Sequence, residues 1–541
     1  MNREAMRDYS ATYSDFRWEV PAQFNFGADV VDRWAEDPVR VALIWCDEAG
    51  TERRFTFADI ARLSNRFANV LHGLGVAKAD RVLVMLPRLP EWQIAMVACL
   101  KLGAIPVPCI DMLTKGDIAY RIQHSGARAA VTTVANIGKF DGPWELAARI
   151  SVGGGEGWTD FAQALEGAPD RFEAAGMAAD DPAIMYYTSG STGKPKGVTH
   201  GARSLFSWRV SAWYWPALTE RDIIWCTADT GWSKAGTSIL FGPWSCGSAV
   251  LFYNGRFDAR KRFELLSEYR VTVFCAAATE FRQLMLEDPS AFDLSALRLC
   301  ISAGETVNPE IVEGWRRLSG IRILDGYGQT ETLMTVLNYP AMSIRPGSMG
   351  RPLPGTTITV LDVANKPAGP GEAGRLLIRL PHPQMMLGYW NDPELTRASI
   401  VHHDGAEWFD SGDIVKRDGD GYVFYLGRSD DLINSAGYRI GPAEVENAVI
   451  EHDAVMECAV VGSPDPDRGE VVKAFVILRP GVAGTDALVK EIQDHVKQAT
   501  APYKYPRKIE FVTKLPKTSS GKIRRRLLRE QEYRVMQRTM P

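Results

Sequence analysis

The sequence predicts a mixed α/β protein with a β-rich part, in which a large N-terminal region of several subdomains is followed by a small, mobile α+β domain. Three observations support this. The 541 residues exceed what one hydrophobic core normally supports, so two or more domains are expected. Helical and strand patterns alternate over the first four-fifths of the chain. Near Asp413 the pattern changes, and a segment of about 110 residues follows with its own strands and helices.

The alternation is clearest near the N-terminus. Residues 59–75, DIARLSNRFANVLHGLG, carry apolar side chains at helical spacing and stop at a glycine. RVLVMLP (81–87) is a short apolar run that predicts a buried strand, EWQIAMVACLKLG (91–103) predicts a helix, and AIPVPCI (104–110) predicts another strand. This βαβα order predicts a largely parallel sheet covered by helices, and it recurs around 271–277 and 298–303.

The C-terminal part begins with a predicted hairpin. DIVKRDGDGYVFYLGR (413–428) has two strand patterns around the turn 418–421. A helix at 441–452, strands at 458–463 and 470–478, a helix at 486–499 and a strand at 508–512 follow. We therefore expect an N-terminal domain at 1–427, a polar hinge at 428–432 and a C-terminal domain at 433–541.

Composition excludes several function classes. With 62 basic and 66 acidic residues the net charge is −4, which gives no overall attraction to nucleic acid or anionic membrane. The eight cysteines contain no CxxC pair, so neither a disulfide framework nor a structural zinc site is expected. We expect no membrane span and a cytoplasmic location, because the N-terminus lacks an apolar leader and no apolar run is long enough to cross a bilayer.

The C-terminal tail is basic, with twelve Lys or Arg against three Glu in 501–541. Such a tail is either a solvated surface or a site for a polyanion, and charge alone leaves both open.

The stretch YYTSGSTGKPKGVTH (186–200) is rich in glycine, hydroxyl side chains and lysine. Only two residues separate Gly190 from Gly193, so it is not a Walker loop, and it lacks the GxSxG pattern of hydrolases. A strand pattern precedes it and a helical pattern (202–215) follows. Strand, glycine-rich turn and helix predict backbone N–H groups that converge on a phosphate. A plain surface loop is the alternative.

Further motifs follow in a fixed order: SAGE (302–305), DGYGQTET (325–332), FDSGD (409–413), LGRSDDLINSAGYRIGPAEVE (426–446) and PKTSSGKIRR (516–525). Together with the loop, these motifs resemble those of the AMP-forming acyl-CoA synthetases of the adenylate-forming superfamily, and the chain is most similar to their medium-chain branch. The resemblance covers nearly the whole chain and is weakest before about Glu52. It implies an enzyme that uses ATP, Mg²⁺ and CoA to activate a small-molecule carboxylic acid.

The resemblance also implies the nucleotide site. The phosphate loop would be Thr188, Ser189, Gly190, Ser191, Thr192, Gly193, Lys194 and Lys196. The adenine segments would be Gly304, Glu305, Asp325, Gly326, Tyr327, Gly328 and Gln329. Thr330 would bind the α-phosphate, Glu331 would bind Mg²⁺, and Asp413 and Arg428 would bind the ribose. Taken alone, Asp413 would be an ordinary turn residue and Tyr327 a core aromatic.

Two half-reactions are implied as well. Lys522, helped by Arg439, would support adenylation, and a lysine acyltransferase or deacylase acting on Lys522 could regulate it. Rotation at the hinge residue Asp430 would then exchange Lys522 for the tunnel segment Ala436, Gly437 and Tyr438. The outer CoA site would be Arg468, Lys497, Tyr505, Pro506 and Arg507, which favours free CoA over a carrier-protein thiol.

The identity of the acid is less defined. Acetate-specific relatives carry tryptophan where this chain has Gly328, so we expect a larger acid, in a pocket lined by Trp232 and Trp244. A medium-chain or branched short-chain fatty acid is the main expectation. A benzoate-like or alicyclic acid is the alternative, as is a stand-alone adenylation enzyme that loads a carrier protein. Both tryptophans could instead be core residues.

Overall fold

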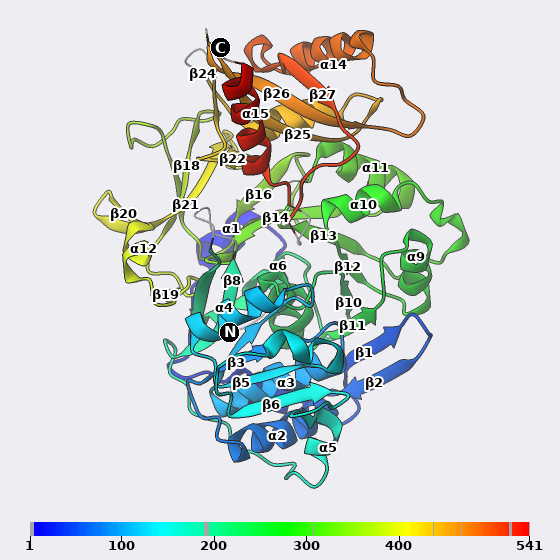
Figure 1. Ribbon diagram of the computed structural model, residues 1–541, viewed down its shortest axis with the longest axis vertical. Helices are drawn as coiled ribbons and strands as arrows, with labels where there is room; N and C mark the ends of the chain where they lie inside the picture. Colours follow the sequence, from blue (N-terminus) through cyan, green and yellow to red (C-terminus); the bar gives the residue numbers. More distant parts are fainter. Residues whose placement is uncertain are drawn as a thin grey trace.

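The computed structural model describes residues 5–188, 194–305, 307–435, 438–466, 468–518 and 522–539. It confirms the mixed α/β class: a large N-terminal part occupies most of the molecule, and a smaller C-terminal part lies on top of it (Figure 1).

A long mixed sheet runs through the N-terminal part, in the order β17-β18-β21-β22-β16-β15-β14-β13-β12-β10-β11-β1-β2, with β20 paired to β21. Its strands are β1 (Val41–Asp47), β2 (Glu52–Thr56), β10 (Ile223–Cys226), β11 (Ala249–Asn254), β12 (Val273–Cys275), β13 (Leu299–Ala303), β14 (Ile323–Gln329), β15 (Leu333–Leu337), β16 (Ser348–Pro352), β17 (Ile358–Leu361), β18 (Ala373–Arg379), β20 (Ile400–His403), β21 (Ala406–Arg417) and β22 (Val423–Arg428). From β1 to β14 the neighbouring strands are parallel, and from β14 to β17 they are antiparallel. The second half is the β-rich part that the sequence predicts.

A second, parallel sheet has the order β4-β3-β5-β6-β7. It consists of β3 (Arg81–Val84), β4 (Ile105–Pro108), β5 (Ala129–Thr133), β6 (Ala148–Val152) and β7 (Thr159–Asp160). A small antiparallel sheet joins β8 (Pro182–Thr188), β9 (Lys196–Gly201) and β19 (Gly388–Tyr389).

The helices of the N-terminal part are α1 (Tyr9–Asp15), η1 (Gly27–Asp32), α2 (Phe57–Gly73), α3 (Pro90–Leu102), α4 (Lys115–Ser125), η2 (Val134–Phe140), α5 (Phe161–Leu165), α6 (Ala202–Tyr214), α7 (Ser233–Ala235), η3 (Gly236–Leu240), α8 (Phe241–Ser245), α9 (Ala259–Glu268), α10 (Ala278–Leu284), η4 (Pro289–Ala291), α11 (Pro309–Ser319) and α12 (Pro393–Ala398).

Local chemistry explains why the predicted helices begin and end where they do. A capping box starts α2: the Thr56 hydroxyl accepts from the Asp59 N–H, and the Asp59 carboxylate accepts from the Thr56 N–H. α3 starts with Pro90 at its first turn and ends at Gly103 with φ +75°, a left-handed conformation that favours glycine. α3 is buried all round, which explains its almost continuous apolar sequence.

The C-terminal part has its own sheet, in the order β24-β23-β26-β25 with β27 paired to β26. Its elements are β23 (Ile433–Ser435), β24 (Tyr438–Ile440), α13 (Pro442–Ile450), β25 (Val455–Asp465), β26 (Gly469–Leu478), α14 (Asp486–Ala499), η5 (Pro502–Lys504), β27 (Lys508–Phe511) and α15 (Arg525–Thr539). Separate apolar clusters form the core of this part. The predicted elements of the C-terminal part are confirmed, whereas the domain boundaries stay predictions.

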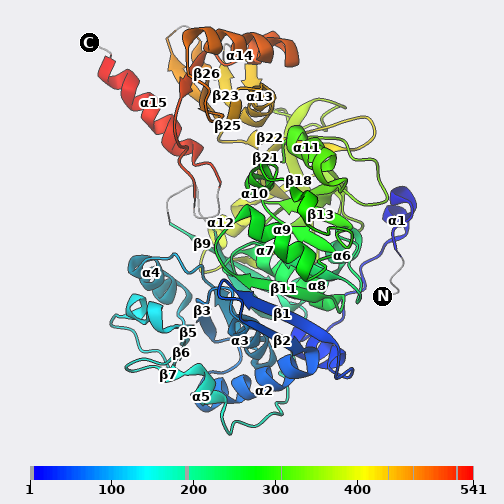
Figure 2. The same cartoon turned by 90° about the vertical axis from the view of Figure 1, so that its right-hand side faces the viewer.

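The last helix was not predicted. α15 lies in the basic tail and extends as a rod beside the C-terminal sheet (Figure 2). Arg525 makes a two-pronged contact with the Glu446 carboxylate of α13, and the Arg529 guanidinium lies 3.2 Å from an Asp431 carboxylate oxygen. These ion pairs, rather than a broad apolar face, anchor the helix.

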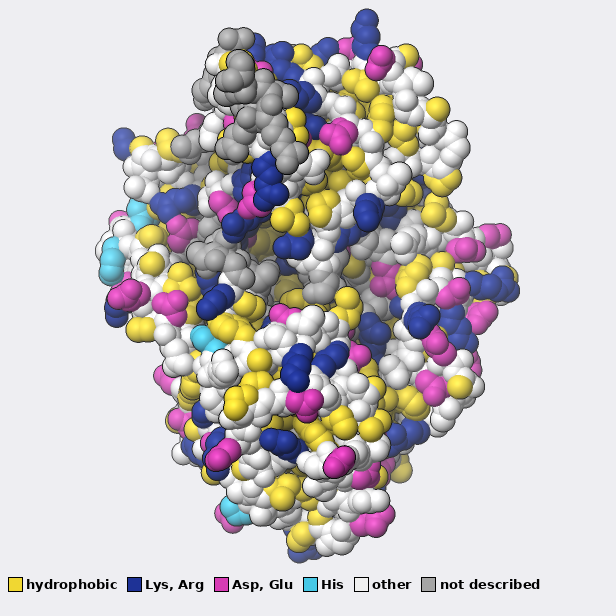
Figure 3. All heavy atoms as spheres, in the orientation of Figure 1, with side chains coloured by type: hydrophobic (Ala, Val, Ile, Leu, Met, Phe, Trp, Pro, Cys, Tyr) yellow, Lys and Arg dark blue, Asp and Glu magenta, His cyan; other side chains and the backbone are white. Residues whose placement is uncertain are grey.

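The surface carries both signs of charge, and Lys and Arg side chains gather where the C-terminal part meets the N-terminal part (Figure 3). In the part of the chain that the structure describes, no helix is long and apolar enough to cross a membrane. All eight cysteines are buried, and none of them forms a disulfide.

Candidate active site

The loop that the sequence predicts to bind phosphate lies in a β-hairpin. β8 pairs antiparallel with β9, and Thr188 faces Lys196 at the open end. Ser189, Gly190, Ser191, Thr192 and Gly193 lie outside the described residues. The predicted strand–turn–helix order is wrong, because β9 intervenes and α6 begins only at Ala202. A helix N-terminus therefore does not follow the loop directly, and any phosphate contact depends on loop N–H groups and lysines.

Both lysines after the loop lie against aromatic rings. The Lys196 ammonium is 5.4 Å from the centre of the Tyr389 ring, and the Lys194 ammonium is 6.0 Å from that of Tyr120. The Tyr120 hydroxyl also donates to the carbonyl of Pro195, at 2.9 Å. These contacts support the exit of the loop.

Thr330 and Glu331 follow the end of β14, at the carboxyl edge of the parallel strands where ligands of such sheets usually bind. The Thr330 hydroxyl is 3.3 Å from that of Ser233, and its carbonyl is 2.7 Å from Nε2 of the buried His200. A Glu331 carboxylate oxygen accepts from the Tyr389 hydroxyl at 2.9 Å. His200, Ser233 and Tyr389 were not predicted as site residues.

Glu331 fits the expected Mg²⁺ site. In the described ranges no three His, Cys, Asp or Glu side chains are grouped to hold a metal ion on their own. Mg²⁺ usually binds one or two carboxylates together with substrate phosphates and water, so a single carboxylate beside a phosphate loop suits it.

Asp413 is the acceptor in a buried hydrogen-bond network. One carboxylate oxygen accepts from the Tyr327 hydroxyl and, at 2.7 Å, from the Gln329 side-chain amide. Arg428, the register partner of Asp413 across β21 and β22, approaches the other oxygen at 3.3 Å. Burial raises the pKa of Asp413, and the Arg428 charge opposes that shift. Asp413 is therefore more than a turn residue, and Tyr327 holds it in place, whereas the stacking of Tyr327 on adenine stays a prediction.

The predicted adenine segments meet at the ends of β13 and β14. Gly304 adopts φ +91°, and the half-buried Glu305 accepts from the Thr279 hydroxyl at 3.3 Å. Burial raises the pKa of Glu305, and burial raises that of Asp325 to about 8. Gly326 is enclosed by side chains, since a Cβ there would lie 2.7 Å from Trp215.

Gly328 needs a correction. A Cβ at this position would lie 1.9 Å from the carbonyl oxygen of Leu333, a backbone atom of β15. Glycine is required here because β15 crosses closely at a register shift between Tyr327 and Gly328. The missing side chain is thus explained by strand packing, and the argument that it enlarges the acid pocket loses its support.

The two predicted pocket tryptophans have different surroundings. Trp244 is fully buried, donates its indole N–H to the Ala42 carbonyl at 3.0 Å and packs on Phe57, which are core contacts. Trp232 is half-buried and directly precedes Ser233, whose hydroxyl lies 3.3 Å from that of Thr330. A position in the acid pocket stays a prediction for Trp232.

An unpredicted cation, Lys234, follows Ser233 in the chain. Lys234 donates to the Ala303 carbonyl at 3.0 Å, and its electrostatic neighbours include Glu305. Burial lowers the pKa of Lys234, but nearby groups outweigh this and raise it, chiefly Cys275 and Cys226, which face each other on β12 and β10. Sequence alone gives no signal for this cluster, because its members come from three separate elements.

Lys522 reaches the N-terminal part from the C-terminal part. Its backbone closes a turn with Thr518, whose N–H donates to the Lys522 carbonyl at 2.7 Å. Lys522 is an exposed residue, but partial desolvation lowers the pKa of its ammonium group, while the nearby carboxylates of Asp413, Glu305 and Glu331 oppose that shift. The structure therefore brings the predicted catalytic lysine together with the predicted ribose and metal residues.

The predicted hinge residue is held on both sides. The Ser429 N–H donates to the Gly412 carbonyl at 2.9 Å, which fixes the chain before Asp430. Arg529 of α15 donates to the Asp430 carbonyl and pairs with Asp431, which fixes the chain after it. Asp430 is the residue between these two anchors.

The predicted CoA residues form one cluster and one separate position. The Lys497 ammonium lies 4.5 Å from the centre of the Tyr505 ring, and Arg507 donates to the Tyr505 hydroxyl at 3.1 Å. Pro506 offers its carbonyl to Gln493 at 3.0 Å. Arg468 lies in the exposed turn between β25 and β26.

For the tunnel segment, Tyr438 stacks on Tyr503 at 4.4 Å between ring centres. Ala436 and Gly437 lie outside the described residues, and Arg439 is placed only by its backbone, in β24.

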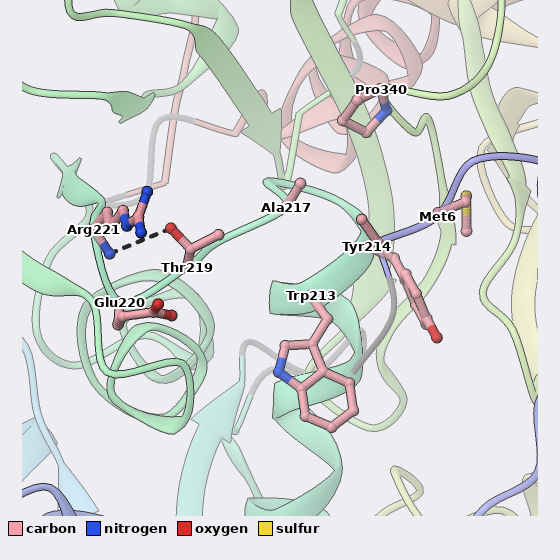
Figure 4. A pocket seen from close by; sticks show the side chains of 9 residues that line it. Met6, Trp213, Tyr214, Ala217, Thr219, Glu220, Arg221 and Pro340 are labelled. Carbon is pink, nitrogen blue, oxygen red and sulfur yellow. Dashed lines mark hydrogen bonds between the residues drawn. The ribbon is translucent and has the colours of Figure 1, made fainter. Parts of the chain in front are cut away.

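A cavity of about 430 Å³ lies elsewhere, at the end of α6 (Figure 4). Met6, Trp213, Tyr214, Glu220 and Arg221 contribute to its wall. None of the predicted ATP or CoA residues lines it.

Comparison with known proteins agrees with this geometry. The family model described as AMP-binding enzyme matches residues 30–390, and the AMP-binding enzyme C-terminal domain matches 444–522. The chain is 40% identical to the mitochondrial acyl-coenzyme A synthetase ACSM3 of Mus musculus, over 97% of this chain and 93% of that protein. It is also 40% identical to the mitochondrial acyl-coenzyme A synthetase ACSM5 of Homo sapiens, over 95% and 91%.

Solved structures are similar over the same length. The anthranilate CoA ligase AuaEII in complex with anthranoyl-AMP has a TM-score of 0.87 at 32% identity, covering 96% of this chain and 98% of that one. A benzoate CoA ligase from Burkholderia xenovorans LB400 has a TM-score of 0.83 at 32% identity, covering 94% and 100%.

Proposed function

Because this chain belongs to the family of AMP-forming acyl-CoA synthetases, we propose that it joins CoA to a carboxylic acid larger than acetate, a medium-chain or branched short-chain fatty acid. The chain is an ATP-dependent acid–thiol ligase. The observation that carries the proposal is the meeting of Lys522, from the C-terminal part, with Asp413 and Glu331 of the N-terminal part.

In the first half-reaction, an oxygen of the acid attacks the α-phosphorus of ATP and pyrophosphate leaves. Both reactants are anions, so the site must offset their repulsion. The Lys522 ammonium would lie between the carboxylate and the α-phosphate, and the Thr330 hydroxyl would donate to an α-phosphate oxygen. Lys196 and the loop N–H groups would bind the departing pyrophosphate. Mg²⁺, held by Glu331, would neutralise phosphate charge.

In the second half-reaction, the CoA thiol attacks the acyl carbon and AMP leaves. A turn of the C-terminal part about Asp430 would withdraw Lys522 and bring Gly437 to the site, where a glycine lets the pantetheine arm pass close to the backbone. The basic cluster of Lys497 and Arg507 would bind the phosphates of CoA. The phosphates of CoA would thus be the anionic partner of Arg507, which belongs to the basic tail.

The acid has two candidate classes. The likeness to acyl-coenzyme A synthetases favours a fatty acid, whereas the likeness to an anthranilate and a benzoate CoA ligase supports an aryl acid as the second candidate. Loading of a carrier-protein thiol is the third, and the basic CoA cluster argues against it.

An acid panel tests the proposal. Purified enzyme, MgATP and CoA are combined with straight, branched, alicyclic and aryl acids, and pyrophosphate release and thioester formation are measured as kcat/KM. The proposal predicts the highest values for fatty acids of about four to ten carbons, since each additional buried CH₂ contributes about 0.8 kcal/mol. Highest values for benzoate or anthranilate would select the aryl alternative. Adenylation without CoA thioester formation would select the carrier-protein alternative.

Location and regulation are part of the same proposal. Eight buried cysteines without a disulfide suit a reducing compartment such as the cytoplasm. Acylation of the Lys522 ammonium by a lysine acyltransferase would remove the charge needed for adenylation, and a deacylase would restore it.

A further inference from the structure

We propose that His200 and Tyr389 are positioning residues that hold Thr330 and Glu331 in register with the phosphate loop. The inference rests on the proposed function, since it concerns the residues that would bind the α-phosphate and Mg²⁺. Neither His200 nor Tyr389 would itself touch the reacting atoms.

The small sheet β19-β9-β8 provides the framework. β9 leaves the phosphate loop at Lys196 and pairs with β8 on one side and β19 on the other. Tyr389 is the register partner of Val198, and the Trp390 N–H donates to the Gly197 carbonyl at 2.7 Å. The strand β9 is therefore joined on both edges, so a side chain on β9 or β19 has a fixed place relative to Thr188 and Lys196, the described residues at either end of the predicted loop.

From β9, His200 reaches Thr330. Its ring is fully buried, and Nε2 lies 2.7 Å from the Thr330 carbonyl oxygen. A carbonyl oxygen can only accept a hydrogen bond, so Nε2 carries the proton and Nδ1 of the neutral ring is unprotonated. Nδ1 has no partner within the described ranges. Burial lowers the pKa of His200 to about 4, so the ring is a neutral donor throughout the neutral range.

From β19, Tyr389 reaches Glu331. Its hydroxyl donates to one carboxylate oxygen at 2.9 Å, and the nearby Met386 N–H donates to the Glu331 carbonyl at 2.9 Å. The Glu331 carboxylate, held in this way, would bind Mg²⁺ when the ion is present. Lys196 lies over the same tyrosine ring, so one side chain contacts both the phosphate-loop lysine and the metal carboxylate.

Together these contacts fix two consecutive residues from two adjacent strands. The backbone of Thr330 is held by His200, and both the backbone and the carboxylate of Glu331 are held by the segment that contains Tyr389. The α-phosphate contact and the metal contact thereby keep a constant distance from the loop that holds the leaving pyrophosphate. Reaction rates are sensitive to displacements of about 1 Å at such a site.

The first experiment removes one hydroxyl. Tyr389→Phe should raise the Kd of ATP measured with Mg²⁺ about ten-fold, the lower end of the usual effect of losing a partner of a metal ligand. The Kd of ATP measured with excess EDTA should stay within about two-fold of wild type. The reaction of a supplied acyl-adenylate with CoA should be unchanged. Tyr422→Phe is the matched control, because it removes a buried hydroxyl that donates to the Ser343 carbonyl at 2.7 Å.

The second experiment compares two substitutions of equal length at His200. In His200→Gln the amide nitrogen occupies the place of Nε2 and keeps the donor, whereas His200→Met removes it. We expect the kcat for adenylation to fall at least ten-fold further in the methionine variant, since a buried carbonyl is left without a partner. His382→Met is the control for loss of a buried neutral histidine, whose bond is to the Thr356 hydroxyl at 3.0 Å.

The outcomes separate the proposals. Equal shifts in ATP binding with and without Mg²⁺ in Tyr389→Phe, or equal adenylation by the two His200 variants, would overturn the positioning role. If wild type binds MgATP but adenylates no acid, the proposed function fails. In that case the Mg²⁺-dependent binding shift still decides the role of Tyr389, and the same measurement on the His200 variants decides that of His200.

Discussion

Replacing the buried carboxylate of Asp413 by an amide tests the ribose site and its supporting network together. Asp413 is 3% exposed and accepts hydrogen bonds from Tyr327, Gln329 and Arg428. In Asp413→Asn the single remaining oxygen can still serve Tyr327 and Gln329. The new amide N–H₂ group then faces the Arg428 guanidinium, and donor meets donor.

The expected cost follows from these contacts. A hydrogen bond to a charged group contributes about 1.5–3 kcal/mol and a neutral one about 1 kcal/mol, so the two retained bonds lose about 2 kcal/mol in all. Loss of the Arg428 contact adds about 1 kcal/mol. Burial raises the pKa of Asp413, so relief of the buried charge offsets the loss at the two retained bonds, and the cost that remains comes from the Arg428 contact. We expect the free energy of unfolding to fall by about 1 kcal/mol.

Nucleotide binding should weaken as well. The carboxylate oxygen that Arg428 approaches at 3.3 Å has capacity left to accept from a ribose hydroxyl. Loss of a charged acceptor there costs about 2 kcal/mol, or roughly thirty-fold in the Kd of AMP.

Urea unfolding and calorimetric AMP titration measure the two effects. Asp410→Asn is the control on the same strand, because Asp410 pairs with Arg375 and accepts from the Gly412 N–H at 2.9 Å. Unchanged AMP affinity in Asp413→Asn would refute the ribose assignment. Unchanged stability would refute the energetic argument for the network.

Three further predictions concern other groups. Burial raises the pKa of Asp325 from 3.8 to about 8, so the folded protein keeps a proton that the unfolded chain has released. The free energy of unfolding therefore falls as the pH rises from about 4 to 8, by up to about 1.4 kcal/mol per pH unit. Asp325→Asn should remove that slope in unfolding measured at pH 5, 6 and 7.5; an unaltered slope would contradict the raised pKa. Lys522→Ala should lower adenylation of the free acid at least a hundred-fold while supplied acyl-adenylate still reacts with CoA, and equal loss of both steps would argue against a lysine specific to one half-reaction. Combined Arg468→Ala and Arg507→Ala should raise the KM for CoA about ten-fold, with the KM for ATP unchanged. An unchanged KM for CoA in steady-state kinetics would show that these arginines do not bind the phosphates of CoA.

Regular elements with a clear local signal were predictable from the sequence. The helix α2, with its apolar spacing and terminal glycine, and the hairpin of β21 and β22 were both expected. β9 was missed because KGVTHG offers few apolar residues, and its strand conformation depends on pairing with β8 and with the distant β19. α15 was missed because ion pairs to distant residues, such as Glu446, anchor it.

Site residues, too, were predictable where a sequence motif marks them and not where only a distant contact does. Lys522, Asp413 and Glu331 were predicted because whole motifs resemble those of a family, and their roles stay predictions. The contact of Gln329 with Asp413 spans 84 residues of sequence, and that of His200 with Thr330 spans 130, so neither follows from local pattern. Gly328 was misjudged for a related reason: a missing side chain suggests empty space, whereas the neighbouring strand fills it.

The anchoring of Asp430 has a mechanical consequence. The Ser429 N–H is bonded to Gly412 of β21, and Arg529 joins the Asp430 carbonyl and Asp431 to the helix that follows the Lys522 turn. In the proposed rotation at Asp430, the bond from the Asp431 N–H to the Arg428 carbonyl would break. A lid on such a pivot would turn between separate end positions instead of drifting, and the distance that Lys522 travels would be set by the backbone angles at Asp430.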